Sequence, residues 1–375
     1  MDTVGVYVQV PFCQTKCTYC NFHTGIVPQK RYEPYVAAAQ TEITGASKQH
    51  HADTLYIGGG TPSLLKPELL ANLIASIRDA FSWSGGEVTL EADPETVEAG
   101  KARAWATRGI NRISFGSQSF VDEELRAAGR MHRASDIYRA VPILREAGIR
   151  NVSFDLIAGL PKQTRESWRF SLAETIRLEP EHVSIYMMEI DEGSRLGLEV
   201  LNSGTRYSAR ELPSDEEMAE FYREAQQQLC TAGYEQYEIS NWAKPRYASK
   251  HNLKYWRRQP YLGFGAGAHS FSGKQRWSNV HDAAAYVAAL EAGRSPVEKV
   301  EEVTAESAFQ EEIFLGLRQL AGIDVGRIER EYGVDLQEKL RRLASNGMLE
   351  REGDVVRLAP GKLHVSNEVL VELLR

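Results

Sequence analysis

The chain contains 375 residues, of which 42% are hydrophobic and 25% are charged, a composition typical of a folded globular protein and not of a disordered one. The formal net charge of −7 excludes a chain-wide basic signature for nucleic acid, although a local basic patch stays open. No stretch reaches the roughly 18 apolar residues of a membrane span, and residues 4–12 are too short for a signal peptide. Three clustered cysteines and a distant fourth do not make a disulfide framework, so we expect a reducing compartment, the cytoplasm.

Short β-branched segments alternate with amphipathic segments over the first half of the chain. Strands are expected at 4–10, 54–58, 87–92, 112–116, 151–159 and 182–188. Helices are expected between them, at 31–46, 67–81, 95–108, 135–147 and 164–178. Six successive β-then-α units predict a parallel sheet covered by helices, either open or closed into a barrel. In both architectures ligands bind at the carboxyl ends of the strands.

The last part of the chain follows a different pattern. Helical periodicity at 304–320, 325–332 and 335–346 precedes a hairpin expected over 348–360 and a closing helix from about Leu363. Such a set resembles a small winged-helix-like module. The polar segment 291–302 reads as a linker, so we expect a core domain over residues 1–270 and a C-terminal domain over 271–375.

Three of the four cysteines, Cys13, Cys17 and Cys20, are spaced C-x3-C-x2-C directly after the first strand. Clustered thiolates bind zinc or iron–sulfur clusters. With His23 the segment becomes a Cys3His zinc candidate. A [4Fe–4S] cluster would instead leave one iron without a protein ligand. Unligated thiols and a redox pair of Cys17 and Cys20 are further alternatives. Cys230, near the end of an expected helix, is interpreted as a small buried apolar residue.

Polar residues and glycines follow the other expected strands. The glycine run 58–60 lets the backbone approach a ligand, or is only a tight turn. Glu91 suits the hydroxyls of a ribose, or is an ordinary loop acid that shares a helix cap with Asp93. Asp155 lies inside an apolar strand, where a buried acid needs hydrogen-bond partners. These strand ends therefore predict a ligand site.

The cysteine spacing after the first strand resembles the signature of the radical S-adenosylmethionine (SAM) superfamily. That resemblance implies a partial (β/α)6 radical SAM barrel with a small, mostly helical, winged-helix-like C-terminal domain. It implies that Cys13, Cys17 and Cys20 hold a [4Fe–4S] cluster whose open iron binds SAM, which is cleaved reductively to a 5′-deoxyadenosyl radical. Resemblance to the coproporphyrinogen dehydrogenase (HemN) branch, over nearly the whole chain, implies these SAM contacts: Tyr7, Tyr19, Gly59, Gly60, Thr61, Glu91, Gln118, Arg130 and Asp155.

Two features separate the chain from the decarboxylating enzyme of that branch. Phe22 stands where that enzyme has a further cysteine, and the cluster begins early, at residue 13. The segments HNLKYW (251–256), GFGAGAHS (263–270) and RLAPGKLHVSNEVL (357–370) instead resemble the heme chaperones of the branch. That resemblance implies heme binding, transfer to recipient hemoproteins and no coproporphyrinogen oxidase activity. It also implies an electron donor such as flavodoxin or ferredoxin and a monomer or dimer, with transient membrane association open.

The residues that would hold heme are less defined. His251, Tyr255 and His269 are candidate iron ligands, and Tyr255, Trp256 and Trp242 offer flat faces to a macrocycle. Equally, His251 can be a buried hydrogen-bonding residue and the aromatic residues can be core. His132 and His281 are weaker candidates.

Two other functions remain alternatives. One is an oxygen-independent coproporphyrinogen III oxidase or a related HemN-like enzyme that methylates or cyclopropanates. The other is a zinc-stapled α/β binding protein.

Overall fold

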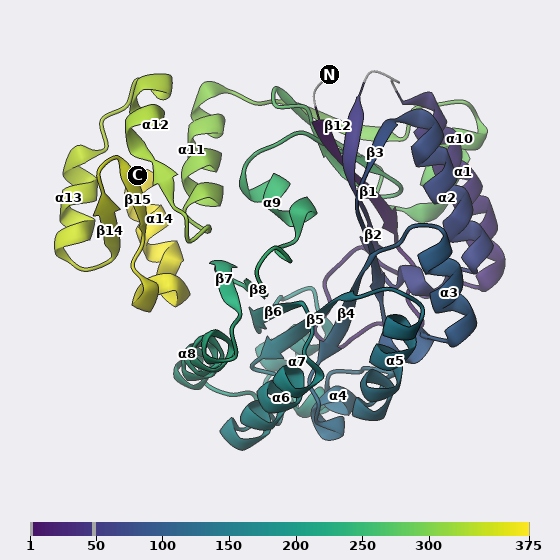
Figure 1. The fold of residues 1–375 in the computed structure, drawn as a ribbon, viewed down its shortest axis with the longest axis horizontal. Coiled ribbons are helices and arrows are strands. Elements are labelled where there is room, and N and C mark those ends of the chain that lie inside the picture. Colours follow the sequence, from purple (N-terminus) through teal and green to yellow (C-terminus); the bar gives the residue numbers. More distant parts are fainter. Residues whose placement is uncertain (1–2, 47–49, 375) are drawn as a thin grey trace.

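The computed structural model describes residues 3–46 and 50–374 (Figure 1). Its centre is a curved sheet with six parallel strands in chain order: β1 (Thr3–Val10), β2 (His51–Gly59), β3 (Ser82–Ala92), β4 (Arg112–Gln118), β5 (Asn151–Ala158) and β6 (His182–Met187). Each pairs in parallel with the next. The two outer strands pair with later strands and not with each other, so the parallel part is an open barrel. The partial (β/α)6 barrel predicted from the sequence is confirmed.

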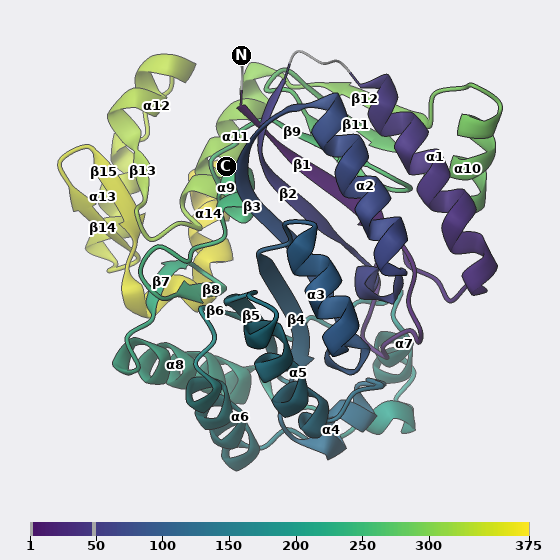
Figure 2. The same cartoon turned by 45° about the vertical axis from the view of Figure 1, so that its right-hand side comes forward.

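Helices cover the outer, convex face of these strands (Figure 2). They are α1 (Tyr32–Gly45), α2 (Pro67–Ala80), α3 (Ala99–Thr107), α4 (Asp122–Ala127), α5 (Ala134–Glu146), α6 (Arg165–Leu178) and α8 (Asp215–Thr231). In α2 the buried residues Leu70, Leu73, Ile74 and Ile77 recur at helical spacing, so one apolar stripe faces the sheet. Burial of such stripes against the β-branched strands forms the main core.

Six further strands extend the sheet beyond the barrel. They are β7 (Glu235–Glu238), β8 (Asn241–Ala243), β9 (Tyr261–Phe264), β10 (His269–Phe271), β11 (Gln275–Asn279) and β12 (Val297–Glu302). The full order is β12-β11-β10-β9-β1-β2-β3-β4-β5-β6-β8-β7. Helix α10 (Ala283–Glu291), which follows β11, packs against α1. The division expected at residue 270 therefore cuts the sheet, and the segment expected as a linker contains its edge strand.

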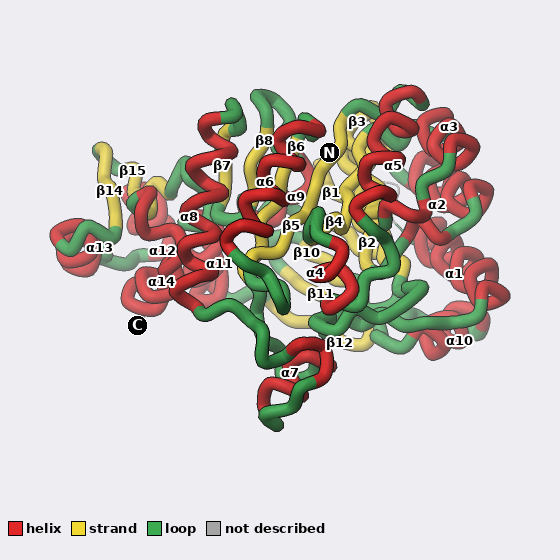
Figure 3. Tube along the Cα trace, turned by 90° about the horizontal axis from the view of Figure 1, so that it is seen from below, coloured by secondary structure: helices red, strands yellow, loops and turns green. Residues whose placement is uncertain are grey.

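Two short helices depart from the outer layer. Helix α9 (Lys250–Trp256) lies on the concave side, between the large sheet and the C-terminal part (Figure 1). Helix α7 (Arg195–Leu201) projects below the body of the molecule (Figure 3). Single turns of 3₁₀ helix occur at Gln29–Arg31, Pro62–Leu64, Pro94–Thr96 and Arg206–Ser208, and a longer one at Pro360–Val365.

The C-terminal part matches the winged-helix-like prediction. It contains α11 (Ala305–Gly316), β13 (Ile323–Asp324), α12 (Val325–Tyr332), α13 (Gln337–Ser345), β14 (Leu349–Glu352), β15 (Val355–Leu358) and α14 (Ser366–Leu374). Its three strands form a separate sheet in the order β13-β15-β14. Gly353 takes a positive φ of 62° in the tight turn between β14 and β15, which confirms the expected hairpin. Within residues 3–46 and 50–374, no helix is long and apolar enough to cross a membrane.

Candidate cluster and cofactor site

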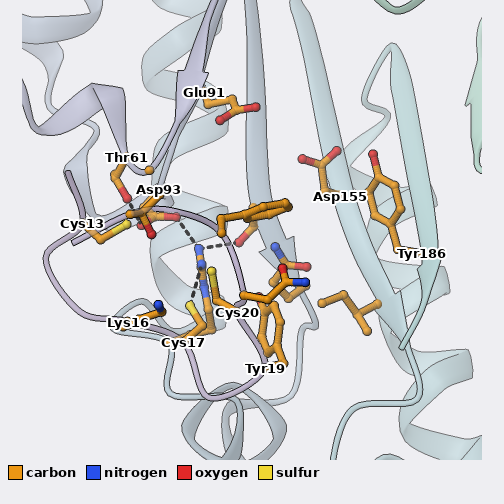
Figure 4. A pocket seen from close by; sticks show the side chains of 18 of the residues that line it. Cys13, Lys16, Cys17, Tyr19, Cys20, Thr61, Glu91, Asp93, Asp155 and Tyr186 are labelled. Carbon is orange, nitrogen blue, oxygen red and sulfur yellow. Dashed lines mark hydrogen bonds and ion pairs between the residues drawn. The ribbon is translucent and has the colours of Figure 1, made fainter. Parts of the chain in front are cut away.

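A cavity of about 560 Å³ lies at the carboxyl ends of the parallel strands (Figure 4). The loop after β1 forms one wall, and residues at the ends of β2 to β6 form the other. This is the position at which parallel α/β sheets bind ligands. The cavity therefore joins the cysteine segment to the strand-end residues that the sequence singled out.

The three clustered cysteines all line this cavity. Cys13, Cys17 and Cys20 are free thiols and partly buried. The loop is pinned by backbone hydrogen bonds, from Cys13 N to Gly25 O (3.0 Å) and from Thr18 N to Ala128 O (3.0 Å). Burial raises the pKa of the Cys13 and Cys20 thiols, so their thiolate forms require a cationic partner. Three soft donors that line one cavity fit an iron–sulfur cluster with one iron left open.

The geometry argues against the zinc-stapled alternative. Among the residues that the structure describes, no three His, Cys, Asp or Glu side chains converge as a single metal ion requires. His23, the fourth ligand of that hypothesis, is exposed and packs against His281 with the two rings tilted by 37° and 4.2 Å between their centroids. Cys230 is exposed on α8, so the interpretation of this residue as buried is wrong.

The glycine run at the end of β2 allows the cysteine loop to approach closely. A Cβ atom on Gly60 would lie 2.4 Å from the carbonyl oxygen of Phe12, so no larger residue fits without a backbone shift. The N–H groups of Gly60 and Thr61 donate to Val10 O and Phe12 O. Because these N–H groups already donate within the protein, the groups left to hydrogen-bond a ligand are the carbonyl oxygens of the glycine run and the Thr61 hydroxyl.

Glu91 is the last residue but one of β3 and lines the cavity. Its carboxylate accepts hydrogen bonds from the Tyr56 hydroxyl and from the Gly59 N–H, each at 2.8 Å. Burial raises the pKa of Glu91 to about 7, against the opposing effect of these two hydrogen bonds. The residue is therefore held in place, and a carboxylate so placed can accept hydrogen bonds from the hydroxyls of a ribose.

Arg130 forms a network that the sequence analysis missed in part. Its guanidinium pairs with Asp93, donates to the carbonyl oxygen of Gly116 at 2.8 Å, and donates to Cys17 Sγ at 3.3 Å. Asp93 also accepts from the Thr61 hydroxyl at 3.1 Å. The dashed lines in Figure 4 mark contacts of this network beside the labelled Asp93 and Cys17. Arg130 thus contacts a cysteine of the loop and also lines the cavity in which a ligand would bind. Asp93 is a site residue whose only signal in the sequence was its position two residues after Glu91.

The far wall of the cavity comes from the ends of β4 to β6. Asp155 accepts from the Ser114 hydroxyl at 3.3 Å, and burial raises its pKa. Tyr186, which the sequence analysis did not name, lies beside Asp155 on the neighbouring strand β6 in Figure 4 and remains 45% exposed. Gln118 takes a left-handed backbone with φ of 61°, a strain that is typical of functional sites. Gln118 and Asp155 line the same cavity.

The two tyrosines expected near SAM have different surroundings. Tyr19 lines the cavity between Cys17 and Cys20. Tyr7 is not part of the wall; its hydroxyl donates to Gln9 and its ring stacks on Tyr56 at 6.1 Å. Tyr7 thus packs against Tyr56, the residue whose hydroxyl donates to Glu91.

The HNLKYW segment forms helix α9, and its histidine is enclosed. His251 is 1% exposed; its Nδ1 contacts the Thr54 hydroxyl at 2.9 Å and its Nε2 contacts the Tyr255 hydroxyl at 2.8 Å. Glu87 caps the helix by accepting from the N–H groups of Lys250 and His251, both at 3.1 Å. This geometry favours the structural alternative for His251.

The remaining heme candidates are dispersed. His269 is exposed, with its ring 6.5 Å from that of His281. Trp242 is fully buried in the core, whereas Tyr255 and Trp256 line a second cavity. His132 is buried, with Nε2 facing Ser117 O at 3.0 Å. The structure therefore does not gather the predicted heme residues at one point.

Comparison with known proteins connects this site to a family. The model of the radical SAM superfamily matches residues 7–173, and that of the HemN C-terminal domain matches residues 303–360. The chain is 35% identical to the "Heme chaperone HemW" of Bacillus subtilis (strain 168), over 97% of each chain. The chain belongs to the HemW family.

Other HemW proteins are also similar to this chain over most of its length. The HemW of Lactococcus lactis subsp. lactis is 29% identical, over 99% of this chain and 97% of that one. The HemW of Escherichia coli (strain K12) is 35% identical, over 72% of this chain and 70% of that one. The fold matches the radical SAM enzyme coproporphyrinogen III oxidase (HemN) from Escherichia coli with a TM-score of 0.84, over 99% of this chain and 90% of that chain. At 22% identity this last likeness shows the fold alone.

Proposed function

We propose that this HemW-family chain is a heme chaperone: it holds a [4Fe–4S] cluster and SAM in the strand-end cavity, binds heme, and transfers heme to recipient hemoproteins. The observation that carries this proposal is the 35% identity to a HemW protein over 97% of both chains. The three cysteines in one cavity and the carboxylates opposite them support it.

In this proposal the chain's own residues bind and orient. Cys13, Cys17 and Cys20 ligate the cluster, which together with SAM supplies one-electron cleavage chemistry when both are bound. Glu91 and Asp155 hold the nucleoside end of SAM. The other proposed SAM contacts are Tyr7, Tyr19, Gly59, Gly60, Thr61, Gln118 and Arg130. Of these, Tyr7 would act indirectly, because its ring packs against Tyr56, which hydrogen-bonds to Glu91.

Phe22 supports a chaperone rather than an oxidase. It stands where the decarboxylating enzyme has its further cysteine, and in this structure it is 67% exposed at the mouth of the cavity. A phenyl ring offers no ligand to iron and leaves an apolar group facing outward. We therefore propose that coproporphyrinogen III is not turned over.

The finer assignments of partners follow from the same proposal. Recipients are hemoproteins that lack heme, and the electron donor is a small redox protein such as flavodoxin or ferredoxin. A cytoplasmic location and a monomeric or dimeric state remain predictions, which size-exclusion chromatography and fractionation would check.

The decisive experiment uses one anaerobically reconstituted sample for three measurements. Heme uptake is followed by the Soret band, heme transfer by the recovery of an apo-hemoprotein such as apomyoglobin, and decarboxylation of coproporphyrinogen III by product analysis with SAM and reductant. We expect stoichiometric heme binding and transfer without turnover. Sustained decarboxylation, or failure to bind heme, would refute the chaperone assignment.

A further inference from the structure

The loop between α4 and α5 is fastened to the cysteine loop. The Thr18 N–H donates to Ala128 O at 3.0 Å, and the Thr18 hydroxyl donates to Ala127 O at 3.2 Å. Gly129 takes a positive φ of 74°, and a Cβ atom there would lie 3.3 Å from Thr18 N and 3.6 Å from Cys17 Cα. The two backbones therefore lie close together at a fixed position beside Cys17.

Arg130, the next residue, lies in the wall of the cysteine cavity, and its side chain is only 10% exposed. Its Nη1 donates to Cys17 Sγ at 3.3 Å, while its Nη2 donates to Gly116 O at 2.8 Å and pairs with Asp93. These contacts use three of the five guanidinium N–H groups and leave two for a ligand in the cavity. The protein alone therefore holds the guanidinium against the sulfur, without the help of SAM.

Asp93, the partner of Arg130, is itself fixed on two sides. Its carboxylate accepts from the Thr61 hydroxyl at 3.1 Å, and its N–H donates to Ser63 Oγ at 3.3 Å. The carboxylate thus anchors the arginine to the loop that follows β2. It also brings an opposing charge to the same end of the cavity.

Cys17 differs from the other two cysteines of the loop. In the part of the chain that the structure describes, Cys17 Sγ is the only one of the three sulfurs that accepts a hydrogen bond from a cationic side chain. Hydrogen bonds from charged donors are stronger than those from neutral donors. Because arginine keeps its charge throughout the physiological pH range, this contact is permanent and not a pH switch.

We propose that Arg130 raises the reduction potential of the iron–sulfur cluster through its hydrogen bond to Cys17, and that Asp93 is the positioning residue that holds the guanidinium there. This inference rests on the proposed ligation of a [4Fe–4S] cluster by Cys13, Cys17 and Cys20, and it names the residue that tunes that cluster. The reduction potential of such clusters depends on hydrogen bonds to the sulfurs and on the charge nearby. Groups that hydrogen-bond to a metal ligand tune the metal in the same way.

The direction of the effect follows from charge. One-electron reduction adds a negative charge to the cluster and consumes no proton. A guanidinium in contact with a cysteine sulfur stabilises the reduced state more than the oxidised state, so it raises the potential. The charge of Asp93 acts in the opposite direction, whereas its oxygen atoms keep the arginine in place. A higher potential makes the cluster easier to reduce by the electron donor of the proposed function.

Arg130→Met tests the contact, with Arg126→Met as its matched control. Arg126 is 59% exposed on α4 and pairs with Asp122, so its substitution removes the same charge without touching a cysteine. The full-length proteins are reconstituted anaerobically without SAM, and the reduced cluster is followed by electron paramagnetic resonance during titration with dithionite.

We expect the Arg130→Met potential to be lower than that of wild type by at least about 59 mV, a tenfold change in a one-electron equilibrium. Arg126→Met should keep the wild-type potential. Equal potentials in wild type and Arg130→Met would overturn the proposal.

Two substitutions of Asp93 separate its charge from its positioning role. The amide oxygen of Asp93→Asn still accepts from Arg130 and Thr61, while the negative charge is lost, so the potential should rise. Asp93→Leu lacks both the charge and the anchor, so its potential should lie below that of Asp93→Asn. Equal potentials in these two variants would refute the positioning role of Asp93. The pair tests the same contact where Arg130→Met assembles no cluster.

Iron and sulfide content and heme transfer, measured on the same samples, distinguish this inference from the proposed function. Wild-type protein that assembles no cluster on the three cysteines, or that transfers no heme, would refute the proposed function. Normal cluster content and heme transfer, with an unchanged potential in Arg130→Met, would refute only the role of Arg130.

Discussion

Glu91→Gln is expected to remove a pH-dependent loss of stability that the wild-type chain shows between about pH 4.5 and pH 7. Burial raises the pKa of Glu91 from 4.5 to about 7 in the folded chain. In the unfolded chain the carboxyl regains its ordinary pKa near 4.5. Between these two values the folded state binds more protons than the unfolded state, so stability falls as the pH rises through this window.

The size of the effect follows from the two pKa values. A difference of about 2.5 units corresponds to about 3.4 kcal/mol once the carboxyl is ionised in both states. Because Glu91 borders a cavity open to water, we expect about 1–3 kcal/mol. Glutamine preserves the local structure, since its amide oxygen can accept from Gly59 N–H and its amide nitrogen can donate to the Tyr56 oxygen.

The assay is urea unfolding of SAM-free protein at pH 5 and pH 7.5, for wild type and for Glu91→Gln. The difference in free energy of unfolding between wild type and Glu91→Gln gives the contribution of the Glu91 carboxyl, because other groups titrate equally in both proteins. The variant should gain stability relative to wild type at the higher pH. Glu98→Gln, at an exposed helix terminus without a side-chain cap, is the control and should show no such gain. An equal difference between wild type and Glu91→Gln at both pH values would refute the reasoning.

Three other predictions follow from the same structure. Cys17→Ser should prevent assembly of an intact cluster, because no further cysteine of the loop can replace one of the three ligands. Substitution of the exposed Cys230 by Ser should leave assembly intact, and the iron and sulfide content after reconstitution distinguishes the two variants. Asp155→Asn should weaken SAM binding by about 1.5–3 kcal/mol without changing the cluster spectrum, and a calorimetric titration with wild-type affinity would remove Asp155 from the site. Glu87→Ala should destabilise α9 by about 1–3 kcal/mol and lower its hydrogen-exchange protection, and protection equal to that of Glu98→Ala would contradict the capping role.

The barrel was predictable because each of its β–α units is defined locally. The strand at Asn151–Ala158 and the stripe on α2 bury apolar side chains at the periods of strand and helix, and six such units in succession specify a parallel sheet. The cysteine loop was predictable because its three cysteines lie within eight residues. In both cases the information is contained in a short segment.

The features that the sequence did not predict depend on contacts between distant segments. Arg130 contacts Cys17 across 113 residues of chain and Asp93 across 37, and no local pattern encodes that meeting. Strand β12 was read as a linker because an exposed edge strand carries almost no buried apolar residues. Cys230 was placed in the core by the average behaviour of cysteine, whereas its position on α8 faces solvent.

The histidine of the HNLKYW segment shows why a motif requires its surroundings before its chemistry can be assigned. On sequence alone, a histidine beside two aromatic residues is an obvious candidate for heme iron. In the fold, Glu87 fixes the start of the helix and Thr54 occupies one ring nitrogen, so the second nitrogen can only face Tyr255. The four-residue spacing that packs His251 against Tyr255 therefore serves the architecture of α9, and the chemistry of the motif in this fold is that of a buried hydrogen-bond network.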